Sequence, residues 1–123
     1  MDLYIDFSSD EAIYLQLCNQ IILGIATSRI HEGDSLPSVR QLADTIGINM
    51  HTVNKAYAIL KQEGYLKLDR RKGAVINVSA DKLLILSRMK SAFAAVVARG
   101  VANGVSRDET HALIDELYDE LES

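Results

Sequence analysis

The feature that most constrains this sequence is a pair of short amphipathic segments that meet at a break over residues 47–49. Both segments place apolar residues at positions i, i+3, i+4 and i+7, the spacing that lines one face of an α-helix. These residues are Val39, Leu42, Ala43 and Ile46 in the first segment and Val53, Ala56, Tyr57 and Leu60 in the second. Two short helices that meet across so tight a turn predict a helix-turn-helix.

Residues that flank these segments supply a start and a stop for each helix. Ser38 and Gln41 have the spacing of a capping box, and Gly47 is typical of the left-handed residue that ends a helix. Asn49 is a favourable N-cap for the second helix, which Gly64 is expected to stop.

A longer helix is expected ahead of the helix-turn-helix. Ser8 to Glu11 has the S-x-x-E form of a capping box, which predicts a helix that starts there and runs to about Ser28. Apolar residues recur along it at helical spacing, at Ile13, Tyr14, Leu17, Ile21 and Ile25. Gly24 lies inside this helix, where a glycine costs about 1 kcal/mol relative to alanine.

Two β-prone segments follow the helix-turn-helix. Residues 65–68 and 74–78 are joined by a loop, residues 69–73, that contains a glycine. This arrangement predicts a β-hairpin. A helix-turn-helix followed by a β-hairpin is a winged helix, and it is predicted to occupy residues 1–78.

The remaining residues, 79–123, are predicted to form a tail of two helices. The first starts near Ala80 and stops at Gly104, and the second opens with Ser106 to Glu109, again in the S-x-x-E form. Because these helices hold too little chain to form a core alone, we expect the tail to dimerise with a second copy. The expected interface residues are Leu86, Met89, Phe93, Val96, Leu113, Leu117 and Leu121. The predicted fold is therefore mostly α with a small β-hairpin: a winged helix-turn-helix followed by a two-helix C-terminal dimerisation tail.

Charge is unevenly distributed along the chain. The formal net charge is −4, but residues 29–73 hold eight basic residues against five acidic ones. Residues 1–28 hold no lysine or arginine, and residues 74–123 are again acidic. Because local potential draws a phosphate backbone, the basic middle favours DNA as the partner of the winged helix.

The second helix of a helix-turn-helix enters the major groove of DNA, and the side chains opposite its buried stripe read the bases. In the first turns of the predicted helix, His51 and Lys55 point away from the stripe, and Thr52 and Asn54 lie on its flanks. Asparagine pairs with adenine, lysine donates to guanine or phosphate, and threonine contacts a thymine methyl group or a phosphate. The alternative is a solvated helix face.

Arg40 is the expected phosphate clamp. It lies beside the Ser38 cap at a helix N-terminus, which already favours anions. The alternative for Arg40 is a surface salt bridge to Asp44.

The tip of the predicted hairpin is strongly basic. Arg70, Arg71 and Lys72 are adjacent and precede Gly73. A minor groove or a flanking phosphate would compensate their charge, and the alternative is a solvated loop.

No catalytic or metal-binding residues are expected. His31, His51 and His111 are isolated from one another, and Cys18 is the one cysteine. The sequence therefore predicts no enzyme and no cofactor, and an enzyme would remain a hypothesis only if a cofactor copurified. A lone thiol fits a reducing compartment, and the sequence shows neither a signal peptide nor a membrane span, so a cytoplasmic protein without a membrane partner is expected.

Residues from about 10 to 78 closely resemble the N-terminal winged-helix domain of the GntR family of bacterial transcription regulators. The resemblance rests on the segments IYLQL (13–17), GDSLPSVRQLA (33–43), GINMHTVNKAY (47–57) and LKQEGY (60–65). The helical remainder looks like that of the short YtrA-type subfamily, whose members dimerise through a two-helix tail. The resemblance implies that Arg40, Thr52 and the residues around Asn49 contact operator DNA, and that a glycine-bearing wing tip reaches the minor groove.

These features predict a sequence-specific DNA-binding transcription regulator. The resemblance implies a homodimeric repressor of its own operon, often one that encodes a membrane transporter, and two-fold symmetry would require a palindromic double-stranded operator. An effector molecule is left open. The alternative is a winged-helix protein-interaction module whose basic hairpin binds an acidic partner.

Overall fold

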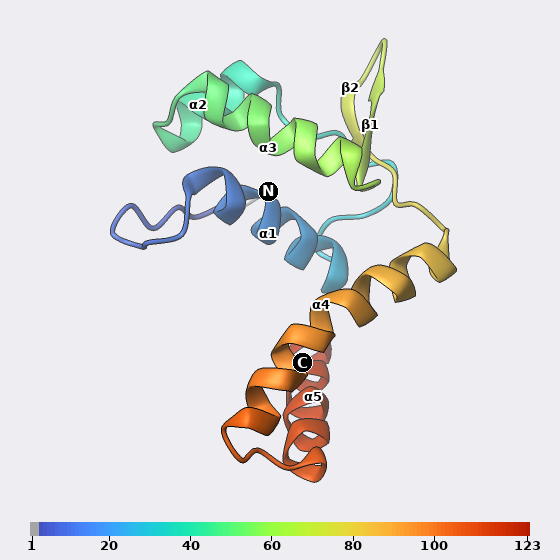
Figure 1. The fold of residues 1–123 in the computed structure, drawn as a ribbon. Coiled ribbons are helices and arrows are strands. Elements are labelled where there is room, and N and C mark those ends of the chain that lie inside the picture. The colour runs from blue at the N-terminus through green and yellow to red at the C-terminus, as the bar shows by residue number, and fades with distance from the viewer. Residues whose placement is uncertain (1–2) are drawn as a thin grey trace. The chain divides into compact units, whose positions relative to one another are not determined.

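The computed structural model describes residues 3–123, which fall into two compact units, one up to Ser79 and one from Ala80. The first unit contains α1 (Ile13–Ala26), α2 (Val39–Ile46), α3 (Met50–Gln62), β1 (Leu66–Asp69) and β2 (Gly73–Ile76), and the second contains α4 (Lys82–Ala102) and α5 (Arg107–Glu122). Figure 1 shows α3 running along α1 in the first unit, with the hairpin beyond the end of α3. The predicted fold, mostly α with one small β-hairpin, is confirmed.

The helix-turn-helix is capped as the sequence predicts. The Ser38 hydroxyl accepts from the Gln41 amide at 3.1 Å, and the Gln41 side chain accepts from the Ser38 amide at 3.1 Å. Gly47 ends α2 in the left-handed conformation with φ 81°. Asn49 Oδ1 then accepts from the His51 amide at 2.6 Å, which satisfies one of the free N–H groups of α3.

The core of the first unit lies where α3 packs on α1. Leu17 and Ile21 of α1 are wholly buried, as are Val53 and Leu60 of α3. The stripe predicted for α3 is buried at all four positions. Tyr57 adds a polar contact, because its hydroxyl donates to the carbonyl oxygen of Pro37 at 2.8 Å. This bond ties the middle of α3 to the chain just before α2.

The predicted start of α1 is wrong, because the helix begins at Ile13 and not at Ser8. The Ser8 amide and hydroxyl both donate to Asp6 Oδ1, at 3.0 and 2.6 Å. Ser9 Oγ accepts from the Glu11 amide at 3.0 Å. Short polar side chains that bond to nearby backbone stabilise turns in competition with a helix, and residues 6–11 form turns for this reason.

Two glutamines of α1 hold the chain that precedes the helix. Buried Gln16 accepts from the Asp6 amide at 2.9 Å and donates to the carbonyl oxygens of Asp6 and Glu11 at 3.0 and 2.9 Å. Gln20, one turn later, accepts from the Tyr4 amide at 2.7 Å and donates to the Tyr4 carbonyl oxygen. The two side-chain amides therefore pair with the backbone of the extended segment as a neighbouring β-strand would.

Gly24 is required by the chain reversal after α1. The amides of Arg29 and Ile30 donate back to the Gly24 carbonyl oxygen at 2.9 and 3.0 Å. A Cβ atom on Gly24 would lie 2.5 Å from Cδ1 of Ile30, which is closer than atoms pack. Glycine is a weaker helix former than alanine, but without a Cβ atom it leaves room for the side chain of Ile30 on the returning chain.

The hairpin is antiparallel, with Leu66 opposite Ile76 and Asp69 opposite Gly73. Its second strand is also paired on its other side. The Leu36 amide donates to the Ala74 carbonyl oxygen at 2.8 Å, and the Ile76 amide donates to the Asp34 carbonyl oxygen at 2.8 Å. The segment before α2 therefore anchors the wing to the body of the unit.

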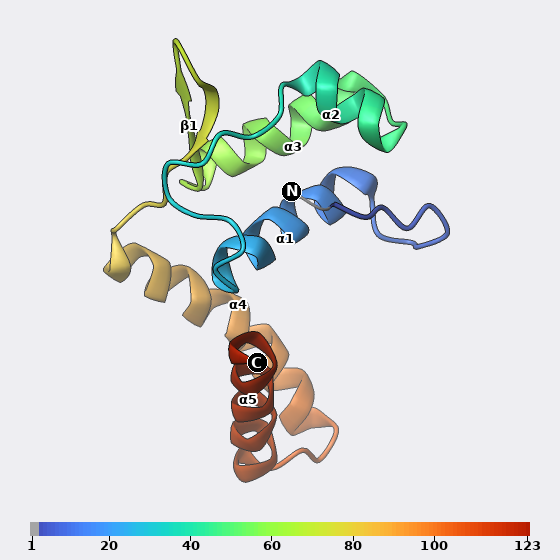
Figure 2. The same cartoon turned by 180° about the vertical axis from the view of Figure 1, so that it is seen from behind.

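The second unit is a helical hairpin, in which the chain reverses at Gly104 and α5 runs back toward the start of α4 (Figure 2). The predicted capping box forms, with Ser106 Oγ accepting from the Glu109 amide at 3.1 Å. Hydrogen bonds from Ser106 also hold the pKa of the Glu109 carboxyl below its usual value. Neither helix contains a buried residue. Over residues 3–123, no helix is long and apolar enough to cross a membrane.

Candidate nucleic-acid interface

The outward face of α3 carries the predicted base-reading residues. His51, Asn54 and Lys55 are exposed, and Thr52 is half-buried at the flank of the helix. Asn49 uses only its side-chain oxygen in the cap, so its NH₂ group stays available as a donor. The arrangement presents amide, imidazole and hydroxyl groups side by side in the first turns of the helix.

Lys55 has a partner that the sequence analysis missed. Its ammonium nitrogen lies 3.9 Å from the centroid of the Tyr14 ring, in the first turn of α1. A cation over an aromatic face at an exposed site contributes about 0.5–1 kcal/mol, so the contact restrains the lysine without neutralising it. The charge of Lys55 is therefore held beside α1 and remains exposed to solvent.

The N-terminus of α2 presents a second group of candidate contacts. Arg40 is exposed, and the salt bridge to Asp44 that was its alternative does not form. The Ser38 hydroxyl accepts a bond in the cap but keeps its own proton free to donate. A free guanidinium and a free hydroxyl thus flank the open N–H groups of a helix start, which suits a phosphate.

The wing tip is a well-ordered turn with three exposed basic side chains, Arg70, Arg71 and Lys72. Asp69 Oδ1 accepts from the Arg71 amide at 2.8 Å and from the Lys72 amide at 3.0 Å. The bonds from Lys72 and Arg71 lower the pKa of the Asp69 carboxyl. Gly73 closes the turn at φ 74°. The carboxylate thus organises the backbone of the tip, and the basic side chains extend beyond it.

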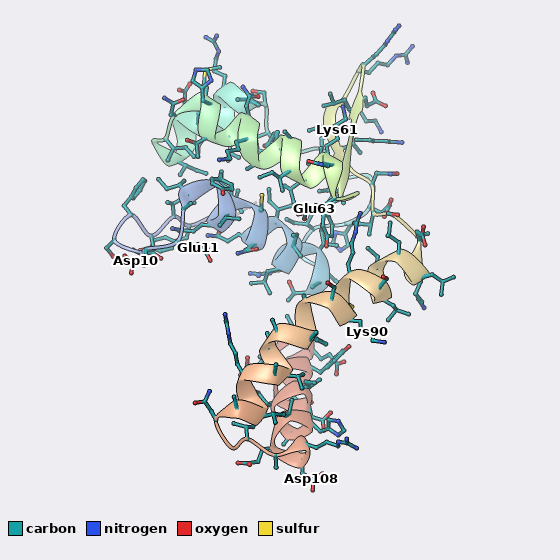
Figure 3. The ribbon with its side chains drawn as sticks, in the orientation of Figure 1. Asp10, Glu11, Lys61, Glu63, Lys90 and Asp108 are labelled. Carbon is teal, nitrogen blue, oxygen red and sulfur yellow. The ribbon has the colours of Figure 1, made fainter. Side chains whose placement is uncertain are left out.

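The acidic residues of the loop before α1 are remote from this tip. Asp10 and Glu11 lie on the loop before α1, at the opposite end of the unit from the hairpin tip (Figure 3). Lys61 lies in the last turn of α3, toward the hairpin (Figure 3). Lys61 and the basic wing tip therefore share one end of the unit, where Glu63 and Asp69 also lie.

Neither a metal cluster nor a reactive thiol is found among the described residues. Across residues 3–123, no group of three His, Cys, Asp or Glu side chains is placed to hold a metal ion. Cys18 is buried, its thiol donates to the Ala56 carbonyl oxygen at 3.5 Å, and burial raises its pKa. A raised pKa disfavours the thiolate, which is the reactive form.

Three residues near this interface were missed in the sequence. Tyr14 and Tyr57 appeared only as members of apolar stripes, although each uses a polar property of its ring or hydroxyl. Met50 was passed over as the first residue of α3, yet 41% of it is exposed. An apolar residue next to an N-cap and outside the i, i+3, i+4, i+7 stripe was the available signal for Met50.

Comparisons with known proteins show which family the chain resembles. Residues 10–76 match the family described as "Bacterial regulatory proteins, gntR family". The chain is 33% identical over 116 residues to the HTH-type transcriptional repressor YtrA of Bacillus subtilis, covering 92% of this chain and 89% of that protein.

Two solved structures extend the similarity to the fold. A transcriptional antiterminator from Listeria monocytogenes superposes with a TM-score of 0.86 at 28% identity, over 100% of this chain and 94% of that one. YtrA from Sulfolobus acidocaldarius, a GntR-family transcription factor, superposes with a TM-score of 0.61 at 37% identity, over 75% of this chain and 97% of that one. The chain belongs to the GntR family of bacterial regulatory proteins, which are transcription regulators and not enzymes.

Proposed function

We propose that this protein is a sequence-specific regulator that binds double-stranded operator DNA through α2, α3 and the wing. The observation that carries the proposal is the outward face of α3, where exposed polar groups stand opposite a fully buried stripe. The proposed contact residues are Ser38, Arg40, Asn49, His51, Thr52, Asn54, Lys55, Arg70, Arg71, Lys72 and Gly73. Those on α3 read bases, and Arg40 and the basic tip bind phosphate or the minor groove.

The proposed active form is a homodimer joined through the second unit. The seven predicted interface residues are 38–64% exposed in the single chain, and the aromatic one, Phe93, is 47% exposed. Neither helix of the second unit contains a buried residue. Their exposed apolar side chains therefore support packing against the same two helices of a second copy. A two-fold axis would place two copies of α3 on successive half-sites of a palindromic operator.

Repression is the proposed direction of regulation. The Bacillus subtilis relative is named a transcriptional repressor, and a bound dimer would block access of the transcription machinery to the promoter. The resemblance to the YtrA-type subfamily favours the protein's own operon, encoding a membrane transporter, as the target, and we expect the protein in the cytoplasm with that DNA.

Selection of bound fragments from random duplex DNA, followed by titration at several salt concentrations, tests this proposal. A palindromic consensus is expected, and the logarithm of the binding constant should fall linearly with the logarithm of salt by about 0.9 for each neutralised phosphate. A protein-interaction module with a basic hairpin would enrich no sequence. Sedimentation that shows only monomer at micromolar concentration would refute the dimer.

A further inference from the structure

We propose that Met50 reads the C5-methyl group of a thymine in each operator half-site. This inference rests on the proposed function and names a specificity-determining residue that hydrogen-bond reasoning does not select. It starts from a single anomaly in the DNA-facing elements. Over residues 39–62, which span α2 and α3, Met50 is the large hydrophobic side chain that is exposed.

The exposure of Met50 is not a failure of core packing. The apolar residues around it, Ile46 and Ile48, pack against the core, and the stripe from Val53 to Leu60 is buried. Met50 is the first residue of α3, where the Asn49 side chain caps the helix through the His51 amide at 2.6 Å. The cap fixes the backbone on both sides of Met50, so its side chain projects from a rigid helix start.

The position of Met50 gives it a defined neighbour. Met50 and Asn54 are four residues apart, so they lie one above the other on the same side of α3. Asn54 is exposed, and its side-chain amide offers a donor and an acceptor that match the acceptor and the donor on the major-groove edge of adenine. A thioether next to that amide faces the neighbouring step of the groove, where the thymine methyl group is the one apolar group on a base edge.

The chemistry of the side chain suits this role. Methionine is flexible and polarizable, and it adapts to an irregular apolar surface better than a branched residue does. Its exposed surface would lose contact with water against a methyl group, and no buried polar atom would be left without a partner. The alternative cover for Met50, a second protein chain, would block the start of α3 and with it the predicted base contacts.

Replacement of thymine by uracil in the selected operator tests the inference, because it deletes the methyl group and keeps base pairing. Each thymine of a half-site is replaced in turn, and binding of wild type and Met50→Ala is titrated on every duplex. Burial of one methyl group predicts a loss of about fourfold in affinity per contacted thymine. Wild type should show this loss at the thymine that Met50 contacts in each half-site, and Met50→Ala should lose the sensitivity at that thymine while any thymine that Thr52 contacts stays sensitive.

A matched control is available in Leu23→Ala. Leu23 lies on α1 and is 42% exposed, against 41% for Met50, so it removes a similar apolar surface outside α3. This control should keep the full thymine sensitivity of wild type. Wild-type binding that no uracil replacement weakens, or equal sensitivity in Met50→Ala, would overturn the reading of thymine by Met50 while leaving DNA binding intact. Failure of wild type to select any DNA would instead refute the proposed function.

Discussion

Removal of the Tyr57 hydroxyl by Tyr57→Phe should change stability with a sign that depends on pH. The hydroxyl donates to the Pro37 carbonyl oxygen at 2.8 Å, and 8% of the residue is exposed. At neutral pH the variant loses one buried hydrogen bond and leaves that carbonyl oxygen without its donor. This loss is expected to cost about 1 kcal/mol of unfolding free energy.

At alkaline pH the same hydroxyl lowers the stability of the wild type relative to Tyr57→Phe. Burial raises the pKa of Tyr57 from 10 to about 12, so the unfolded chain releases this proton about two pH units before the folded protein does. Stability from a raised pKa is complete below the unfolded value and is lost as pH rises through the folded value. The full difference corresponds to about 2.7 kcal/mol, of which about half is lost by pH 11.

Urea denaturation of both proteins at pH 8, 10 and 11 measures this effect. Wild type should be the more stable protein at pH 8, and the two free energies of unfolding should cross near pH 11. All other ionisable groups are the same in both proteins, so their contributions cancel in the difference. A difference between the two proteins that stays constant from pH 8 to pH 11 would show that the Tyr57 hydroxyl is not protected by burial.

Three further predictions follow from the first unit. Gly24→Ala should destabilise the fold by about 1–3 kcal/mol in urea denaturation, because crowding at Ile30 outweighs the gain in helix propensity; a more stable variant would contradict the close approach. Arg40→Ala should weaken binding to all sequences and lower the salt slope, whereas Asn54→Ala should change preference at one position of each half-site by about 1–3 kcal/mol; wild-type affinity of Arg40→Ala at every salt concentration would exclude the phosphate clamp. Alanine at all three positions of residues 70–72 should lower the salt slope by about 0.9 per lost contact and keep base preference, and an unchanged slope would mean that the wing does not contact DNA.

Local sequence patterns predicted helix ends only where nothing nearby competed. The S-x-x-Q or S-x-x-E pattern forms a capping box at Ser38 and Ser106, as expected. The same pattern fails at Ser8, because Asp6 lies two residues upstream and takes both the amide and the hydroxyl of that serine. The competing acceptor, Asp6, can be seen in the sequence. Whether the segment forms a turn or a helix also depends on Gln16, ten residues away, which bonds to the Asp6 backbone.

Long-range pairings in the first unit could not be predicted from periodicity. Gln20 bonds to the backbone of Tyr4, and the segment before α2 pairs with β2, about forty residues later in the chain. Neither contact leaves a repeating pattern, because one uses side-chain amides and the other uses backbone groups alone. The outward face of α3 could be predicted, since a helix with one buried stripe fixes which residues face solvent. The Tyr14 contact to Lys55 could not, because it depends on how two helices cross.

The proposed contact surfaces of the first unit are held at fixed spacing by α3 itself. The Tyr57 bond to Pro37 positions the chain that enters α2, and the Ala43 carbonyl oxygen accepts from the amides of Gly47 and Ile48 at 2.9 and 3.0 Å, which fixes the turn between the helices. At the other end, the Tyr65 amide donates to α3 and leads into the wing. Because these bonds form on folding, little ordering remains to be done on association, and rigid surfaces lose less entropy when they bind. Loosening the Tyr57 bond should therefore weaken operator affinity even though Tyr57 itself does not face the DNA.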